Sequence, residues 1–153
     1  MEFFYQDCIN YLEKLHNEIS DEIESLPIEA FDWVPNRRMN SICQLGVHIA
    51  GAERYWSSDV LDQQSSGRDR SAEFSACGLD REAIKTRLAA SLECFRNTLS
   101  HLRVDDLGEP RLFPRDGSRV TVNWAIQHLI AHTATHLGHI QLTRQLWEQN
   151  QRE

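Results

Sequence analysis

Four long stretches of this sequence repeat apolar residues at steps of three and four, the spacing that places them on one face of an α-helix. The first stretch covers about residues 2–25, with Leu12, Leu15 and Ile19 on its apolar stripe and Pro27 after its end. Strand-like alternation is scarce along the chain. A chain of this kind buries its apolar faces by packing helix against helix, so we expect an all-α fold.

The second helix is predicted to begin at Ser41 and to reach about residue 61. Ser41 and Gln44 fit the capping-box pattern, in which each side chain binds a backbone amide left free at the start of a helix. Gly46 and Gly51 each cost a helix about 1 kcal/mol relative to alanine. Their presence therefore predicts the close approach of a neighbouring helix or of a ligand.

Two further helices are predicted. One begins near Asp80, a good N-cap residue, and the other begins after Thr121 and ends near residue 148. The segments between the helices contain prolines, glycines and polar residues and are long enough for crossover connections: residues 27–40, 62–78 and 103–120. We predict a single domain, residues 1–153, folded as an all-α four-helix bundle with long connecting loops.

Composition narrows the classes of partner and the location. Hydrophobic residues make up 41% of the chain and charged residues 25%, as in ordinary globular proteins, and the formal net charge is −7. An acidic chain lacks the basic footprint of nucleic-acid binders, and no apolar run approaches the roughly 20 residues of a membrane helix. The N-terminus lacks the basic start of a signal peptide. We expect a cytoplasmic protein with no nucleic-acid and no membrane partner.

The histidines carry the strongest indication of function. Four of the seven lie in the short run HLIAHTATHLGH, which begins at His128 and ends at His139. His132 and His136 are four residues apart, so on a helix their Cβ atoms lie about 5–6 Å apart and both rings can reach one metal ion. His128 and His139 are about 16 Å apart along such a helix, so one ion cannot bind all four.

A third ligand must come from another helix, and His48 is the candidate. It lies in the apolar run LGVHIAGA, where a buried imidazole is costly unless something binds it. His48, His132 and His136 would leave coordination positions open, which distinguishes a catalytic metal from a structural one. The plainer alternative is that an H-x-x-x-H pair is common on helices; His16 and His101 are expected at the surface or near loops.

Two segments also resemble a known family. They are FDWVPNRRMNSICQLGVHIAGAERYW at residues 31–56 and VTVNWAIQHLIAHTATHLGHI at residues 120–140. With its order of four long helices, the chain resembles the DinB-like superfamily, which includes YfiT-type metal-dependent hydrolases and thiol-dependent S-transferases. The resemblance implies a divalent metal bound by one histidine of the second helix and an H-x-x-x-H pair of the last, which are His48, His132 and His136 here.

The chain departs from that family pattern at one position. The family often has H-x-G-Q at its last ligand, whereas this sequence has His136-Leu137-Gly138-His139. His139 could therefore donate or accept a proton, or offer a fourth ligand atom, while the three predicted ligands stay intact. His128 could support a ligand or be solvated.

Several functions stay open for a divalent ion on three imidazoles, which suit Zn, Ni, Fe, Co or Cu. The ion could activate a low-molecular-weight thiol, as the resemblance implies, or water. We predict a metal-dependent thiol S-transferase acting on a small molecule; the alternatives are a hydrolase on the same triad and a non-catalytic dimeric metal-binding bundle. The resemblance also implies a homodimer, to which Leu146 and Trp147 could contribute apolar surface.

A general base is expected near the metal. Glu53 follows His48 by five residues and so points about 140° away around the helix, which makes His128 and His139 better placed.

Two groups of side chains could meet a substrate. Tyr55, Trp56 and Trp124 are expected either in the core or on an apolar substrate wall. Arg37 and Arg38 are expected either in a solvated loop or against an anionic ligand.

Overall fold

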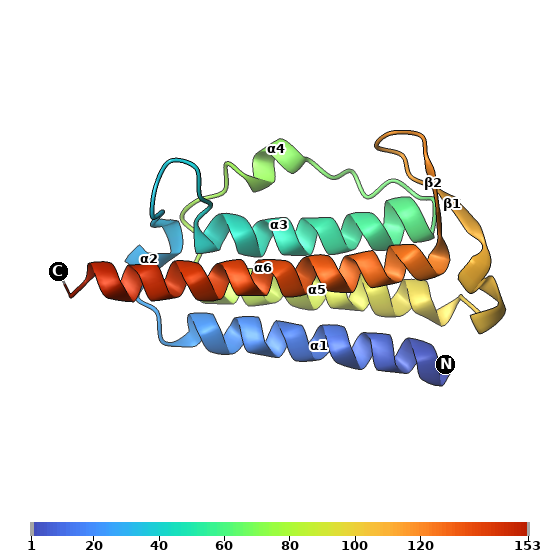
Figure 1. The fold of residues 1–153 in the computed structure, drawn as a ribbon, viewed down its shortest axis with the longest axis horizontal. Helices are drawn as coiled ribbons and strands as arrows, with labels where there is room; N and C mark the ends of the chain where they lie inside the picture. Colours follow the sequence, from blue (N-terminus) through green and yellow to red (C-terminus); the bar gives the residue numbers. More distant parts are fainter. Residues whose placement is uncertain (1, 153) are drawn as a thin grey trace.

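The computed structural model describes residues 2–152 and consists mainly of helices (Figure 1). Each of the four predicted helices is present within about two residues of its expected limits. The second one changes form along its length, because its last six residues, Trp56–Leu61, wind as a π-helix, η1. The long α-helices are α1 (Phe3–Glu24), α3 (Ile42–Tyr55), α5 (Arg81–Ser100) and α6 (Val122–Asn150). The predicted all-α bundle is therefore confirmed.

The four long helices pack as a square bundle. α1 contacts α5 and α6, and α3 contacts the same two helices. α1 and α6 run in one direction, whereas α3 and α5 run in the other (Figure 1). The connection from α3 to α5 must therefore return along the whole bundle, which confirms that the loops permit a crossover. This returning segment carries the short helix α4 (Arg70–Glu73) and lies over α3.

The predicted N-caps start the helices. The Ser41 hydroxyl accepts a hydrogen bond from the backbone N–H of Gln44, and the Gln44 side chain accepts one from the backbone N–H of Ser41, so the capping box is formed. The Asp80 side chain caps α5 by accepting a hydrogen bond from the backbone N–H of Ala83, and the Thr121 hydroxyl caps α6 by accepting one from that of Trp124. These caps fix where α3 and α6 begin, and so fix the height of their histidines in the bundle.

Two smaller features occupy the remaining connections. A single helical turn, α2 (Glu29–Asp32), precedes α3 and buries Phe31. Before α6, a 3-10 turn η2 (Val104–Gly108) leads into an antiparallel hairpin of β1 (Pro110–Leu112) and β2 (Arg119–Thr121). The tip of this hairpin reaches the side of the bundle on which α3 and α6 meet.

Both glycines of α3 lie where another group approaches closely, as predicted. A Cβ on Gly46 would lie 2.7 Å from Cγ2 of Ile84 on α5. A Cβ on Gly51 would lie 2.1 Å from a carboxylate oxygen of Glu73 on α4. Glycine at position 51 therefore allows the crossover segment to bring a carboxylate down onto α3.

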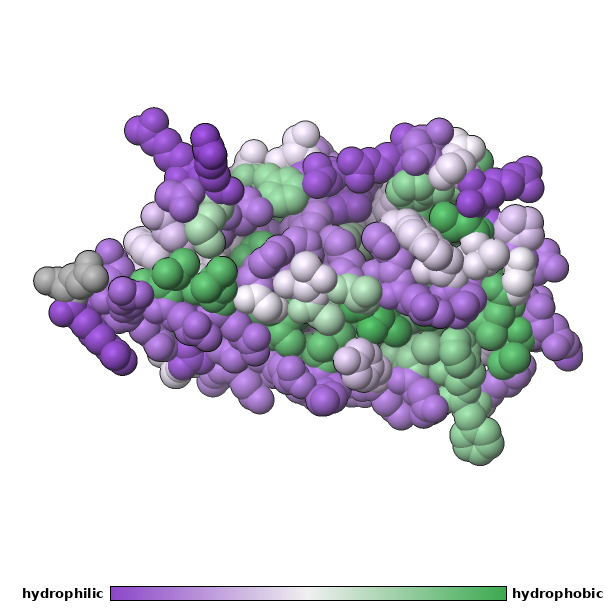
Figure 2. All heavy atoms as spheres, in the orientation of Figure 1, coloured by the Kyte–Doolittle hydropathy of each residue, from purple (hydrophilic) through white to green (hydrophobic). Residues whose placement is uncertain are grey.

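The surface in the view of Figure 2 is mostly hydrophilic, with hydrophobic residues in smaller groups between. Among the described residues, no helix has the length and apolar character needed to cross a membrane. Trp147, suggested above as dimer surface, packs edge-to-face against Trp33, with ring centroids 5.6 Å apart. The homodimer stays a prediction.

Candidate metal centre

The structure brings the three predicted ligands together. His48 comes from the middle of α3, and His132 and His136 come from successive turns of α6. The Nε2 atoms of His48 and His132 lie 3.2 Å apart, and the Nε2 atoms of His132 and His136 are separated by 3.2 Å as well. One nitrogen of each ring lies within 4.8 Å of the other two.

This spacing fits a shared cation. Nitrogens bound at 2.0–2.1 Å to one tetrahedral ion lie about 3.3 Å from each other, close to the separation seen here. Nε2 of His132 faces two other Nε2 atoms at once, yet it can donate at most one proton. Three ring nitrogens that converge in this way suit a divalent ion that keeps other coordination positions open.

Burial keeps the rings of His132 and His136 neutral. Desolvation, aided by the neighbouring histidines, lowers the pKa of His132 to about 3. Desolvation also lowers the pKa of His136 to about 4, with His48 and His139 adding to the effect. At neutral pH both rings therefore have an unprotonated nitrogen, which is the form that binds metals.

A carboxylate behind His48 was missed from the sequence. Oε2 of Glu73 lies 2.8 Å from Nδ1 of His48, and Arg68 donates two hydrogen bonds, of 2.6 and 2.8 Å, to the same carboxylate. Burial alone would raise the pKa of Glu73, but the bonds from Arg68 and His48 outweigh it and lower that pKa. An ionised Glu73 accepts the Nδ1 proton of His48, which leaves the Nε2 lone pair facing the other two histidines.

The two outer histidines occupy different places. Nδ1 of His139 lies 3.1 Å from Nδ1 of His136, and His139 lines a separate cavity of about 290 Å³. His128 instead stacks on Trp124, with ring centroids 4.8 Å apart, and burial lowers its pKa. His139 therefore contacts a predicted ligand from behind, whereas His128 lies one turn from the ligands on the larger cavity described next.

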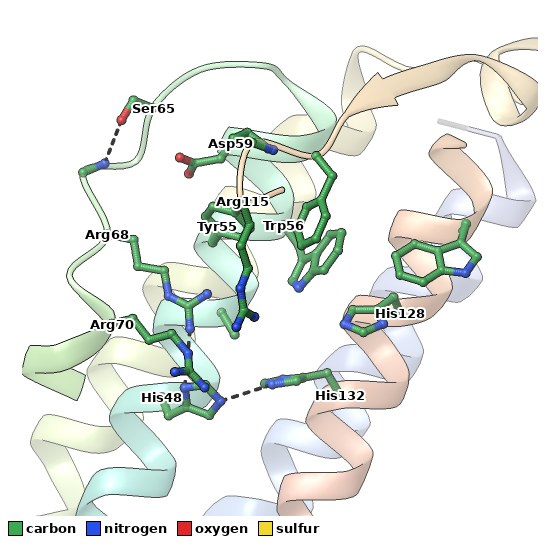
Figure 3. Close-up of a pocket in the computed structure, with 15 residues that line it drawn as sticks. His48, Tyr55, Trp56, Asp59, Ser65, Arg68, Arg70, Arg115, His128 and His132 are labelled. Atoms are coloured by element: carbon green, nitrogen blue, oxygen red, sulfur yellow. Dashed lines mark hydrogen bonds between the residues drawn. The ribbon is translucent and has the colours of Figure 1, made fainter. Parts of the chain in front are cut away.

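A cavity of about 640 Å³ opens beside the histidines (Figure 3). His48 and His132 lie at one end of it, and Trp56 and His128 lie farther along. Trp124 also lines the cavity and stacks on His128. The three aromatic residues considered for a substrate wall, Tyr55, Trp56 and Trp124, all line this cavity. Trp56 is also part of the apolar core, so this residue both packs inside the bundle and lines the cavity.

The arginines on this cavity are not those considered from the sequence. Arg37 and Arg38 are exposed, and Arg38 lies at the smaller cavity. The larger cavity is lined instead by Arg68, Arg70 and Arg115. They come from the crossover segment and the hairpin tip, where no periodic pattern indicates which way a side chain points.

The structure corrects the prediction for His16, which is buried in the bundle, with 6% of its surface exposed. Its Nε2 lies 2.9 and 3.0 Å from the two carboxylate oxygens of Glu53. The hydroxyls of Ser91 and Thr133 donate to the same carboxylate. Glu53 thus points away from His48, as predicted, and binds partners inside the core.

Comparisons with known proteins agree with this fold and site. A family model described as the DinB superfamily matches residues 11–140 and so includes all three histidines. The crystal structure of a conserved protein from Enterococcus faecalis has a similar fold, with a TM-score of 0.74 and 16% sequence identity over 95% of this chain and 97% of that one. No curated protein gives a significant match. The chain belongs to the DinB superfamily.

Proposed function

We propose that this protein is a metal-dependent thiol S-transferase that uses His48, His132 and His136 to hold a divalent cation. The observation that supports transfer over hydrolysis is the state of the nearby carboxylates. Glu73 is bound by Arg68 and His48. Among the described residues Asp59 is the one carboxylate lining the cavity, and it lies at the end away from His48 and accepts a bond from the Ser66 backbone.

Hydrolysis needs a group that moves protons between water and the leaving group. Within residues 2–152, no carboxylate beside the three histidines is free for this role, which leaves His128, on the cavity one turn away, as its candidate. A thiol bound to a divalent cation loses its proton through coordination alone, so transfer needs no such carboxylate. The aromatic side chains of the cavity would hold the electrophile and exclude water. His139 would hold His136 through the contact between their Nδ1 atoms, and any proton it donates or accepts would pass at that contact.

The test begins with elemental analysis of protein purified without a histidine tag, which would compete for the ion. We expect about one first-row divalent metal per chain, because the three nitrogens form one site. The protein, stripped and then reloaded with Zn, Ni, Co, Fe or Cu, is next assayed for conjugation of 1-chloro-2,4-dinitrobenzene with a panel of low-molecular-weight thiols. His132→Ala should lose both metal and conjugation, whereas His101→Ala, an exposed histidine elsewhere, should lose neither.

The alternative outcomes are distinct. Ester or amide turnover without any thiol, lost in His132→Ala, would replace the transferase with a hydrolase on the same triad. Metal binding without turnover on any thiol would leave a metal-binding bundle. His139→Gln restores the residue that the family often has there; unchanged metal content with a shifted pH profile of the rate would support the proton role of His139.

A further inference from the structure

Positive charge gathers at the histidine end of the large cavity. Arg68, Arg70 and Arg115 line it, and their side chains extend toward the region where His48 and His132 meet (Figure 3). The chain as a whole carries a formal net charge of −7, so this cluster of three arginines is opposite in sign to the net charge of the protein. A concave site lined by one sign of charge concentrates ligands of the opposite sign.

The side chains of two of these arginines, Arg70 and Arg115, have no ion-pair or hydrogen-bond partner among residues 2–152. Arg68 is held by Glu73. Over residues 2–152, neither Arg70 nor Arg115 has a carboxylate within ion-pair distance, and neither side chain forms a hydrogen bond. The Arg70 guanidinium lies over the ring of Phe74, at 4.9 Å from its centroid. Guanidinium groups with free N–H donors match the planar, two-oxygen geometry of a carboxylate.

The farther part of the cavity offers flat aromatic surfaces. Trp56 and Phe113 are stacked, with centroids 5.1 Å apart and ring planes 12° apart. Trp124 and His128 are stacked at 4.8 Å and 14°, although 46% of Trp124 is exposed. Surfaces of this kind bind planar groups by stacking and by burial of apolar area.

From this arrangement we infer that the cavity binds a planar organic carboxylate. Its acid group binds Arg70 and Arg115 beside the three histidines, and its flat part packs against Trp56 and Trp124. A volume of about 640 Å³ accommodates a small organic acid. The inference rests on the proposed function, because it gives the chemical class of the compound bound beside the three histidines.

The test uses the full chain as purified and again after removal of metal by a chelator, so that coordination to an ion is separated from binding to the arginines. The probes are 4-nitrobenzoate, its neutral analogue 4-nitrobenzamide, and non-planar cyclohexanecarboxylate. Their binding is measured by quenching of tryptophan fluorescence and by calorimetry. We expect 4-nitrobenzoate to bind at least about tenfold more tightly than either analogue, with or without metal. Arg70→Gln and Arg115→Gln should each weaken it about tenfold, whereas Arg37→Gln, an exposed arginine away from the cavity, should not.

Equal binding of nitrobenzoate and nitrobenzamide would overturn the inference, as would unchanged binding in both cavity variants. Binding that disappears on chelation would overturn it too, because the metal alone would then hold the acid. These results leave thiol transfer to other electrophiles possible. Conversely, the acid could bind through the arginines while no combination of metal and thiol supports conjugation. That result would contradict the proposed transferase function but support the inferred class of ligand.

Discussion

The helix α3 carries one member of each of two buried histidine–glutamate pairs, and the two pairs differ in what surrounds them. His48 binds Glu73, which comes from the crossover segment and is also bound by Arg68. Glu53 binds His16 of α1 and accepts hydrogen bonds from Ser91 and Thr133 as well. The first pair lies beside the cavity, and the second is enclosed by all four long helices.

The difference lies in what is left to bind. The carboxylate of Glu53 receives protein donors at both oxygens, so this pair is satisfied inside the bundle. In the other pair, only Nδ1 of His48 is bound by Glu73, while Nε2 faces His132. The same two residue types thus stabilise the core in one place and orient a histidine of the candidate metal centre in the other, according to where the second ring nitrogen points.

The largest effect is expected on breaking the enclosed pair. Glu53→Ala leaves His16 and the Thr133 hydroxyl buried without their acceptor, whereas the Ser91 hydroxyl keeps the Leu88 carbonyl. The change should lower the free energy of unfolding by about 3 kcal/mol. Urea denaturation of the metal-free protein measures it, with the exposed Glu13→Ala on α1 as control. The folded fraction should still bind one metal; loss of metal binding at unchanged stability would show that the two pairs are not separate.

Breaking the pair beside the cavity, His48 and Glu73, should weaken metal binding rather than the stability of the bundle. Glu73→Gln keeps the shape of the side chain but removes the charge that holds the Nδ1 proton of His48, so metal affinity should fall about tenfold. Competition with a chelator measures the affinity, and Glu53→Gln is the matched control, because that side chain does not touch a ligand. An affinity equal to that of the wild type would mean that Glu73 does not orient His48.

Acid should destabilise the metal-free protein through the cavity histidines. His132 and His136 titrate near 6.5 when unfolded, but their pKa values are lowered to about 3 and about 4 in the fold. The unfolded chain therefore binds more protons below pH 6.5, and stability that is complete above this value is lost as the pH falls toward 4. We expect a loss of about 1 kcal/mol between pH 7 and pH 5.5, allowing for partial solvent screening.

Denaturation curves at several pH values measure this loss, and the double variant His132→Gln/His136→Gln should flatten it. The interval lies above the range in which Glu73 protonates, because the pKa of that carboxyl is lowered from 4.5. A slope that is unchanged in the double variant would assign the acid sensitivity to other groups.

The smallest effect is expected from replacing two helical glycines, Gly138 and Gly51, by alanine. A Cβ on Gly138 would meet nothing within 4 Å, so Gly138→Ala should raise stability by up to about 1 kcal/mol. A Cβ on Gly51 would collide with Glu73, so Gly51→Ala should gain no stability and should weaken metal binding by displacing that carboxylate. Thermal melts and metal titrations of the two variants check this; similar behaviour would show that Glu73 adapts freely.

Periodicity and caps were sufficient to predict the four helices, and the histidine positions were sufficient to predict that His48, His132 and His136 come together. The spacing of His132 and His136 is a property of any α-helix, and an imidazole in the apolar run around His48 needed a partner. The burial of His16 was also readable, because the residue lies four after Leu12 and three before Ile19 on the apolar stripe of α1. The predicted surface position of His16 was therefore wrong, because the residue lies on the face of α1 that packs into the core.

Glu73 and the cavity arginines could not be placed in the same way. They lie in connections whose path depends on how the helices pack. Within a polar loop, no sequence pattern distinguishes a residue that points into a cavity from one that points into solvent. Gly51 was the single local sign, since it predicted a close neighbour without identifying it. The π-helical turn at Trp56–Leu61 had no sequence sign, because it differs from an α-helix only in which carbonyl each amide reaches.

The distance between the two ends of the large cavity follows from α6 alone. Trp124 and His132 both line the cavity and are eight residues apart on this uninterrupted helix. At a rise of 1.5 Å per residue, their Cα atoms are separated by about 12 Å along the axis. The His128 ring lies between the two side chains, with its centroid 4.8 Å from that of Trp124 and 6.2 Å from that of His132. Loop movement cannot change this interval, so a compound that stacks on the indole is held at a fixed distance from the three histidines.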